Sequence, residues 1–279
     1  MKKRLRAHRT LAFLLVVFPF WGIGCANLSA IQEFASISAG SAEYTRLVDQ
    51  YVESPARQKR YQPASQHARL DEMTRMRAAQ RERLLLRQKL VAEYMSALGQ
   101  LAADEIVNYD SQIEGLANAV AQNKFADEKD ADAFASVSKT LLRAATDAWR
   151  QRHLQELITE SNGPLQVVVG TLRDIVEKEF AGDIDNEKLA MTGYYETLIR
   201  SSSDRAGIAA LEEWKTARLA EADARVRSDS CYAQVLSGIA AGHQELYERR
   251  NDLGAQELVR QLKQYSNDIR RLVSAIRGQ

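Results

Sequence analysis

Proline is almost absent from this chain beyond residue 24, and this absence constrains the fold more than any other feature. Pro55, Pro63 and Pro164 are the only prolines there, so none falls between 65 and 163 or after 164. The body is rich in Ala, Leu, Arg, Glu and Gln, the residues that lose least free energy in a helix. No continuous alternating strand pattern is visible. We therefore expect an all-α fold.

Apolar side chains that recur every three or four residues predict a series of helices. Their expected ranges are 41–53, 65–122 as one helix or two, 134–161, 165–180, 189–199, 211–246 and 258–276. Ser161-Asn162-Gly163-Pro164 is expected to stop one helix and start the next, and Ser201-Ser202-Ser203-Asp204 to form a turn that caps a helix. Short connections between such helices favour an elongated antiparallel bundle of about six or seven helices.

The first 25 residues carry the pattern of an export signal. Five basic residues without an acid are followed by an apolar run from Leu11 to Ile23, and small residues lead to Cys25. This order resembles the lipobox signal of bacterial lipoproteins, although that family usually has leucine three positions before the cysteine, where this chain has Gly22. The resemblance implies cleavage before Cys25, diacylation of its sulfur and acylation of the new amine.

The resemblance implies that the body is in the bacterial cell envelope, lipid-anchored and facing the periplasm. In that family the residue after the cysteine directs sorting, and Ala26 rather than Asp implies the outer membrane if the source has two membranes. Two alternatives remain open, an uncleaved membrane anchor from Leu11 to about Ala30 and an ordinary signal peptide cut elsewhere. All three export the body, because positive charge stays on the cytoplasmic side.

The leader and the prolines divide the chain into three regions. Residues 1–24 are the signal peptide, and 25–64 are expected to be a lipid-proximal tether with a short helix and a linker bounded by Pro55 and Pro63. Residues 65–279 are expected to be the helical bundle domain. Without the leader the formal charge is 33 minus 37, or −4, which argues against a nucleic-acid partner.

No catalytic motif is present, and we expect no enzyme activity, metal or cofactor. The HExxH, GxSxG and P-loop spacings are absent. His153 and Glu156 lie one helical turn apart, but a single pair is more typical of a surface contact than of a metal site. Cys231 is the only cysteine beyond Cys25, so packing rather than disulfides must stabilise the fold.

Two features are candidates for binding. Gly238 and Gly242, four residues apart, share one helix face with His243 at its edge. Small residues there let another backbone approach, either a neighbouring helix of this chain or a partner in a groove. Residues 57–89 carry a net charge of +7, whereas residues 104–132 carry −6. The two segments can neutralise each other. Otherwise four arginines of the basic segment are expected to contact lipid headgroups or an acidic partner: Arg75, Arg81, Arg83 and Arg87.

These observations favour a lipid-anchored, non-catalytic envelope protein that acts by binding another protein. It would be an accessory or scaffold subunit of an envelope machine, or an immunity or inhibitor lipoprotein. The alternative is a carrier of lipid or another apolar ligand within the bundle, and an envelope hydrolase is a third class. The membrane, through lipid on Cys25, and a protein are the expected partners.

Overall fold

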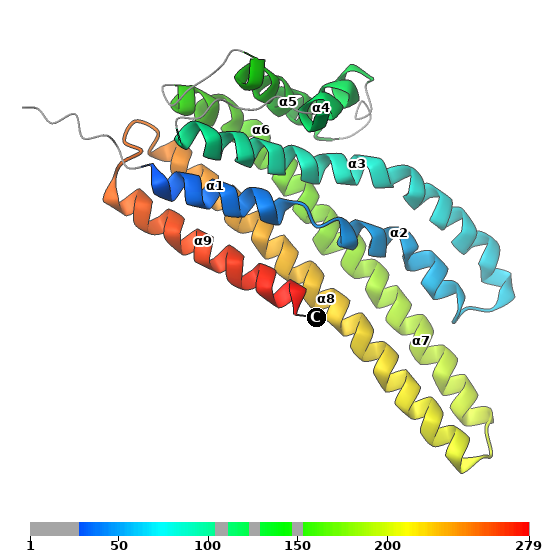
Figure 1. Ribbon diagram of the computed structural model, residues 1–279. Helices are drawn as coiled ribbons and strands as arrows, with labels where there is room; N and C mark the ends of the chain where they lie inside the picture. The colour runs from blue at the N-terminus through cyan, green and yellow to red at the C-terminus, as the bar shows by residue number, and fades with distance from the viewer. Residues whose placement is uncertain (1–27, 104–110, 123–128, 147–152, 279) are drawn as a thin grey trace, which may run out of the picture.

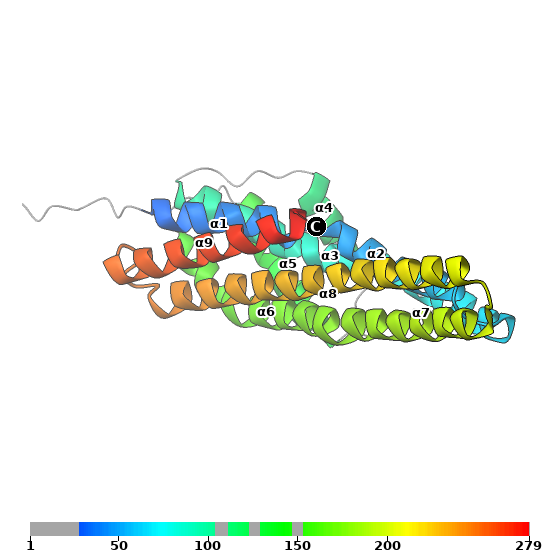
Figure 2. The same cartoon turned by 90° about the horizontal axis from the view of Figure 1, so that it is seen from below.

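The chain folds into a long helical bundle in the computed structural model, which describes residues 28–103, 111–122, 129–146 and 153–278. In chain order the elements are α1 Ser29–Ala42, α2 Thr45–Lys59, α3 Ala64–Ala102, α4 Ser111–Ala121, α5 Ala131–Thr146, α6 Leu154–Asp174, the π-helical segment η2 Ile175–Phe180, α7 Ala181–Ser201, α8 Arg205–Glu248 and α9 Gln256–Arg277. No strand occurs in these ranges, and Figures 1 and 2 show the elongated shape. The predicted all-α bundle is confirmed.

Helix α1 is part of the core. Ile31 and Phe34 are fully buried, and α1 packs against α3, α8 and α9. Tyr232 of α8 donates a hydrogen bond of 2.5 Å to the carbonyl of Ala42, at the end of α1. The structure therefore corrects the predicted lipid-proximal tether where it describes this region, from residue 28 onward. The small residues that suggested a tether let α1 lie close to its neighbours, and its few large apolar side chains fill the core.

Helix α2 continues through Pro55, where the sequence predicts a linker from Pro55 to Pro63. Proline has no N–H to donate to the carbonyl four residues earlier, which here belongs to Tyr51. Arg77 of α3 supplies the missing donor, because its Nη1 lies 3.2 Å from the Tyr51 carbonyl oxygen. Pro63 immediately precedes α3. The predicted linker is therefore wrong for its first half, since tertiary contacts replace the lost backbone bond.

Helix α6, η2 and α7 form one uninterrupted run from Leu154 to Ser201. Pro164 lies inside α6, so the predicted stop at residues 161–164 is wrong. An interior proline costs a helix about 3 kcal/mol, and packing on both sides of Pro164 offsets this cost. Leu165 is fully buried, and Asn162 hydrogen-bonds to side chains of α8. Downstream, η2 places Phe180 in a stack with Tyr51, with ring centroids 4.2 Å apart.

Two helical hairpins extend beyond the main core. One consists of α2 and α3, and the other of α7 and α8, joined through Ser202–Asp204 (Figure 1). Asp204 caps α8 as predicted, because its carboxylate accepts from the N–H groups of Ala206 at 3.1 Å and Gly207 at 2.9 Å. Both hairpin turns lie at the end of the bundle opposite the start of α1.

The main apolar core involves most helices of the bundle and includes the second half of α8, but it contains no residue of α7. Leu172 of α6 and Leu262 of α9 are fully buried in it, as their mid-stripe positions predict. A separate small cluster of Ile184, Met191 and Ala222 holds α7 against α8. The open question about residues 65–122 is answered in part, since α3 ends at Ala102 and α4 begins at Ser111.

Gly238 and Gly242 of α8 are covered by other helices of the same chain. A Cβ atom at Gly238 would lie 3.3 Å from Cγ1 of Ile269 in α9, and one at Gly242 would overlap the ring of Phe34 in α1. The glycines therefore permit close internal packing, and the alternative of a groove open to a partner is wrong. Phe34 accounts for the glycine at position 242.

His243, next to this contact, is a neutral core residue. Gln244 Nε2 donates to Glu248, so the amide oxygen of Gln244 is the atom that accepts from Asn162 Nδ2. The Asn162 side-chain oxygen therefore accepts from His243 Nδ1 at 2.9 Å. His243 Nε2 then accepts from the Tyr94 hydroxyl at 2.6 Å. Burial lowers the pKa of His243 to about 3, so the imidazole stays uncharged.

The contact between Phe34 and Gly242 gives the first prediction. Gly242→Ala should lower the free energy of unfolding by about 1–3 kcal/mol, because overpacking outweighs the gain of about 1 kcal/mol in helix propensity. Gly170→Ala in α6 is the matched control. No side chain lies within 4 Å of its added Cβ, so it should stabilise slightly. Urea denaturation measures both, and adding Phe34→Leu should reduce the cost of Gly242→Ala. Additive effects would contradict the contact.

Candidate functional site

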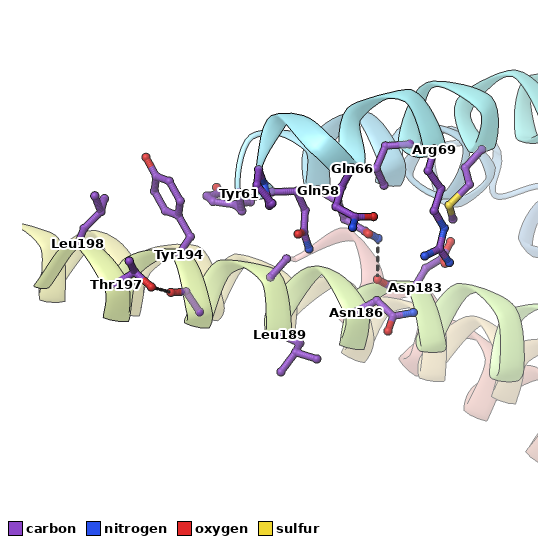
Figure 3. A pocket seen from close by; sticks show the side chains of 16 residues that line it. Gln58, Tyr61, Gln66, Arg69, Asp183, Asn186, Leu189, Tyr194, Thr197 and Leu198 are labelled. Carbon is purple, nitrogen blue, oxygen red and sulfur yellow. Dashed lines mark hydrogen bonds between the residues drawn. The ribbon is translucent and has the colours of Figure 1, made fainter. Parts of the chain in front are cut away.

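A hollow lies between the two hairpins, and we call it the hairpin groove. It has a volume of about 840 Å³ and is bounded by the corner between α2 and α3 on one side and by α7 on the other (Figure 3). Its α7 wall includes Asp183, Asn186, Ala190, Tyr194 and Thr197, which recur at helical spacing and share one face. These positions extend along about four turns of α7, so the groove is long.

Tyrosine side chains form one end of the hairpin groove. Tyr61, at the α2–α3 corner, meets Tyr194 and Tyr195 of α7 with ring centroids 5.6 and 6.1 Å away. Tyr194 remains 40% exposed, and Figure 3 shows its ring directed toward the α2–α3 side. Leu189 is also exposed but points away from that side. An accessible tyrosine, Tyr194, thus lies next to a buried one, Tyr195, at this end of the groove.

The polar lining of the hairpin groove is mainly uncharged. Gln62, Gln66 and Asn186 present side-chain amides that make no hydrogen bond to any other described residue. Gln58 is buried, and its Nε2 donates to the Asp183 carbonyl at 3.3 Å and to Ser54 Oγ at 3.2 Å (Figure 3). Three amides are therefore available to donate to and accept from a ligand.

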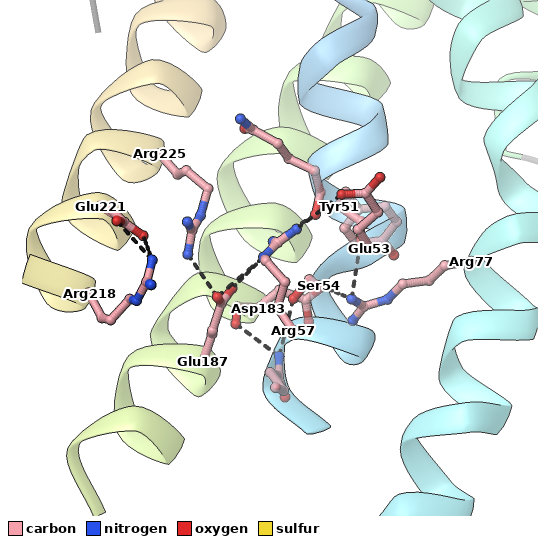
Figure 4. A network of polar contacts seen from close by, with 12 residues as sticks. Tyr51, Glu53, Ser54, Arg57, Arg77, Asp183, Glu187, Arg218, Glu221 and Arg225 are labelled. Atoms are coloured by element: carbon pink, nitrogen blue, oxygen red, sulfur yellow. Dashed lines mark hydrogen bonds and ion pairs between the residues drawn. The ribbon is translucent and has the colours of Figure 1, made fainter. Parts of the chain in front are cut away.

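A set of buried and partly buried ion pairs, which we call the buried charge cluster, adjoins the groove through Asp183, which lines it. It contains Arg57, Arg77, Asp183, Glu187 and Arg225, from α2, α3, α7 and α8 (Figure 4). The Glu187 carboxylate is 3% exposed and accepts from Arg57 Nε at 3.2 Å and from Arg225 Nη2 at 2.8 Å. One α7 carboxylate thus holds α2 and α8 together.

Arg77 makes the second connection of the cluster. Its guanidinium pairs with the Asp183 carboxylate and lies 4.5 Å from the centroid of the Tyr51 ring. Burial raises the pKa of Asp183, while the adjacent Arg77 opposes that rise. Arg77 therefore joins α3 to α7 while also replacing the hydrogen bond that Pro55 removes from α2. Arg77 thus connects the part of α2 around Pro55 to Asp183, which lines the groove.

Asp229 of α8 lines a small hollow of about 10 Å³ next to the cluster. It is 4% exposed and forms no ion pair with any residue in the described part of the chain. Burial raises its pKa to about 7, against the opposing influence of Arg225 and Arg57. The carboxylate is thus half protonated near neutral pH, beside a cluster whose acids are paired.

The arginines predicted as partner contacts are largely engaged within the chain. Arg87 is 2% exposed and pairs with Asp130 through two bonds of 2.8 and 2.6 Å, so its prediction as a contact residue is wrong. Arg81 pairs with Asp49 at 2.8 Å, and Arg75 pairs with Glu72. Arg83 borders a hollow of about 70 Å³ beside Arg87. The pair between Arg87 and Asp130 supports mutual neutralisation of the basic and acidic segments.

The remaining sequence candidates show no reactive arrangement. His153 Nδ1 lies 3.2 Å from Glu156 Oε2 at the surface, and Ser201 Oγ donates to the Leu198 carbonyl at 3.0 Å. No three His, Cys, Asp or Glu side chains among the described residues are grouped to hold a metal ion. Cys25 and the signal at 1–24 lie outside the described residues.

The sequence pattern alone does not distinguish the groove residues. Gln58, Tyr61, Gln62 and Gln66 surround Pro63, and this local enrichment in amides and tyrosine was the available signal. Basic residues in the same stretch make this enrichment hard to recognise. Asn186 and Tyr194 carry no comparable signal, because each is an ordinary surface residue of a helix until the opposing hairpin is placed.

The raised pKa of Asp229 gives the second prediction. Between pH 4 and 7 the folded protein holds a proton that the unfolded chain has released, so this residue makes the free energy of unfolding fall as pH rises. Asp229→Asn should therefore be more stable than wild type at pH 8, by up to about 4 kcal/mol, and similar to it at pH 4.

Urea denaturation at pH 4, 6 and 8 measures this difference. Asp185→Asn, at an exposed position of α7, is the control and should change the free energy of unfolding by less than about 0.5 kcal/mol. A difference between wild type and Asp229→Asn that is the same at every pH would contradict the raised pKa.

Comparisons of the chain with protein-family models, with curated proteins and with solved structures give no match. None of the described helices combines the length and the apolar character needed to span a membrane. The hairpin groove and the chemistry of its lining are therefore the basis for assigning a function.

Proposed function

We infer that this chain is a lipid-anchored bacterial envelope protein that acts by binding another protein, without catalysis, and that the partner docks in the hairpin groove. The observation that carries this inference is the groove itself, a long hollow of about 840 Å³ with an exposed tyrosine at its rim. Tyrosine is enriched among the residues that dominate binding energy at protein interfaces. Arg75, Arg81 and Arg83 are secondary candidates, because Arg75 and Arg81 are paired within the chain. Arg87 is no longer a candidate, because it is buried against Asp130.

The position of the anchor supports a role in presenting the groove. Helix α1 begins at Ser29, four residues after Cys25, and four residues span at most about 14 Å. Because α1 packs into the core, lipid on Cys25 would hold that end of the bundle near the membrane. Both hairpins point the other way (Figure 1), and the 44 residues of α8 extend about 66 Å. The groove would face the periplasm, away from the lipid surface.

Two kinds of binding protein fit this geometry, an accessory or scaffold subunit and an immunity or inhibitor lipoprotein. The alternative function is a carrier of lipid or another apolar ligand within the bundle. Pockets for such ligands usually measure about 300–1,000 Å³ and enclose most of the ligand. The groove has that volume but is bordered by exposed residues, and the two smaller hollows measure about 10 and 70 Å³. Protein binding therefore has more support.

Lipid anchoring gives the third prediction. The mature protein should begin at Cys25, carry lipid there and sediment with the membrane fraction. Cys25→Ser should accumulate as an uncleaved precursor or appear in the soluble fraction. Mass spectrometry of the N-terminal peptide checks the modification. A wild-type protein that is soluble and begins at another residue would exclude the anchor.

Docking in the groove gives the fourth prediction. A photo-crosslinking amino acid at Thr197, in the groove, should form a protein adduct in living cells. The matched position is Met76 of α3, which is 53% exposed and lies outside the groove lining, and it should form none. Adducts of equal yield at both positions, or at Met76 alone, would exclude the groove as the docking site.

A further inference from the structure

We propose that the hairpin groove binds an extended, proline-rich segment in the polyproline II conformation. This inference rests on the proposed function and names the part of the protein partner that enters the groove. Such segments dock in grooves lined by aromatic side chains, because their backbone is already extended and loses little entropy on binding. Tyr61, Pro63 and Tyr194 give this groove a surface of that kind.

The length of the groove suits a short segment of this conformation. Its α7 wall extends from Asp183 to Leu198, which corresponds to about 22 Å at 1.5 Å per residue. A polyproline II helix rises 3.1 Å per residue, so about seven residues fill the groove from end to end. Motifs of this size are recognised through a few ring contacts and a few hydrogen bonds.

The polar lining matches an extended backbone better than a helical one. A polyproline II segment makes no internal hydrogen bonds, so its carbonyl oxygens are free to accept from Gln62, Gln66 and Asn186. A docked α-helix already satisfies its own backbone and would place an apolar stripe over the same amides. Covering unpaired amides with apolar surface costs free energy. The described residues also offer no sheet edge that a β-strand could extend.

The electrostatics of the groove select a segment of low charge. Arg69 is the only basic residue in the lining, and the only acidic residue, Asp183, is neutralised by Arg77. Binding driven by ring packing and neutral hydrogen bonds should depend little on ionic strength. An acidic partner held by the α3 arginines would instead dissociate as salt screens the charges.

The test measures fluorescence polarisation of labelled peptides with the full chain in detergent. A ten-residue polyproline peptide should bind more than tenfold tighter than a glycine–serine peptide of equal length, and its affinity should change less than twofold between 50 and 300 mM salt. Tyr194→Ala and Asn186→Leu should each weaken binding about tenfold. Trp214→Ala is the matched control, because Trp214 is 58% exposed on α8 outside the groove lining, and it should change binding less than twofold.

Circular dichroism and thermal unfolding confirm that each variant remains folded, as the exposed positions of Tyr194 and Asn186 favour. Equal binding of the two peptides, or equal losses in Tyr194→Ala and Trp214→Ala, would overturn the proposal. Tighter binding of an amphipathic helical peptide or of a neutral oligosaccharide would overturn it too. If the crosslink at Thr197 persists while polyproline does not bind, protein binding stands and only the polyproline inference fails. If the Thr197 crosslink is also lost, the proposed function fails with it.

Discussion

The geometry of the hairpin groove depends on one buried carboxylate, Glu187, held by Arg57 and Arg225. The main apolar core includes the second half of α8 but no residue of α7, which only a small cluster holds against the first half of α8. Buried ion pairs rarely add much net stability, because desolvation of the charges costs about as much as their attraction supplies. Their geometry is nevertheless strict, and a missing partner leaves an uncompensated charge. The cluster therefore fixes how the two hairpins sit relative to each other, and so fixes the width of the groove.

Two buried titratable groups change the free energy of unfolding with pH in opposite directions. Asp229, with a pKa of about 7, makes the free energy of unfolding fall with pH from about 4 to 7. His243, with a pKa of about 3, stays neutral while the unfolded chain takes up a proton below about pH 6.5. It therefore makes the free energy of unfolding rise with pH over most of the same window. The two slopes are equal and opposite between about pH 4 and 6.5, so the contributions of Asp229 and His243 to the pH dependence of the free energy of unfolding nearly cancel there.

The sequence predicts the helices well and their interruptions poorly, for a physical reason. Periodicity reports which face of a helix is apolar, and Leu172 and Leu262 are buried as expected. Asp204 caps α8 because capping depends on neighbours only two or three residues away. Pro55 and Pro164 indicate breaks under the same local rules, yet both lie inside helices. Their lost backbone bonds and steric costs are offset by residues distant in sequence, such as Arg77 for Pro55.

The same limit applies to the candidate site. A run of arginines predicts an electropositive face, but it does not reveal which members point inward, and Arg87 is buried against Asp130. The groove is formed by residues 58–73 and 183–198, which are more than 100 residues apart, and neither segment is unusual alone. Its character appears only when Tyr61 meets Tyr194 and three unpaired amides face one hollow. A candidate site of this kind is a property of how the helices pack, and the buried charge cluster joins the four helices of the two hairpins.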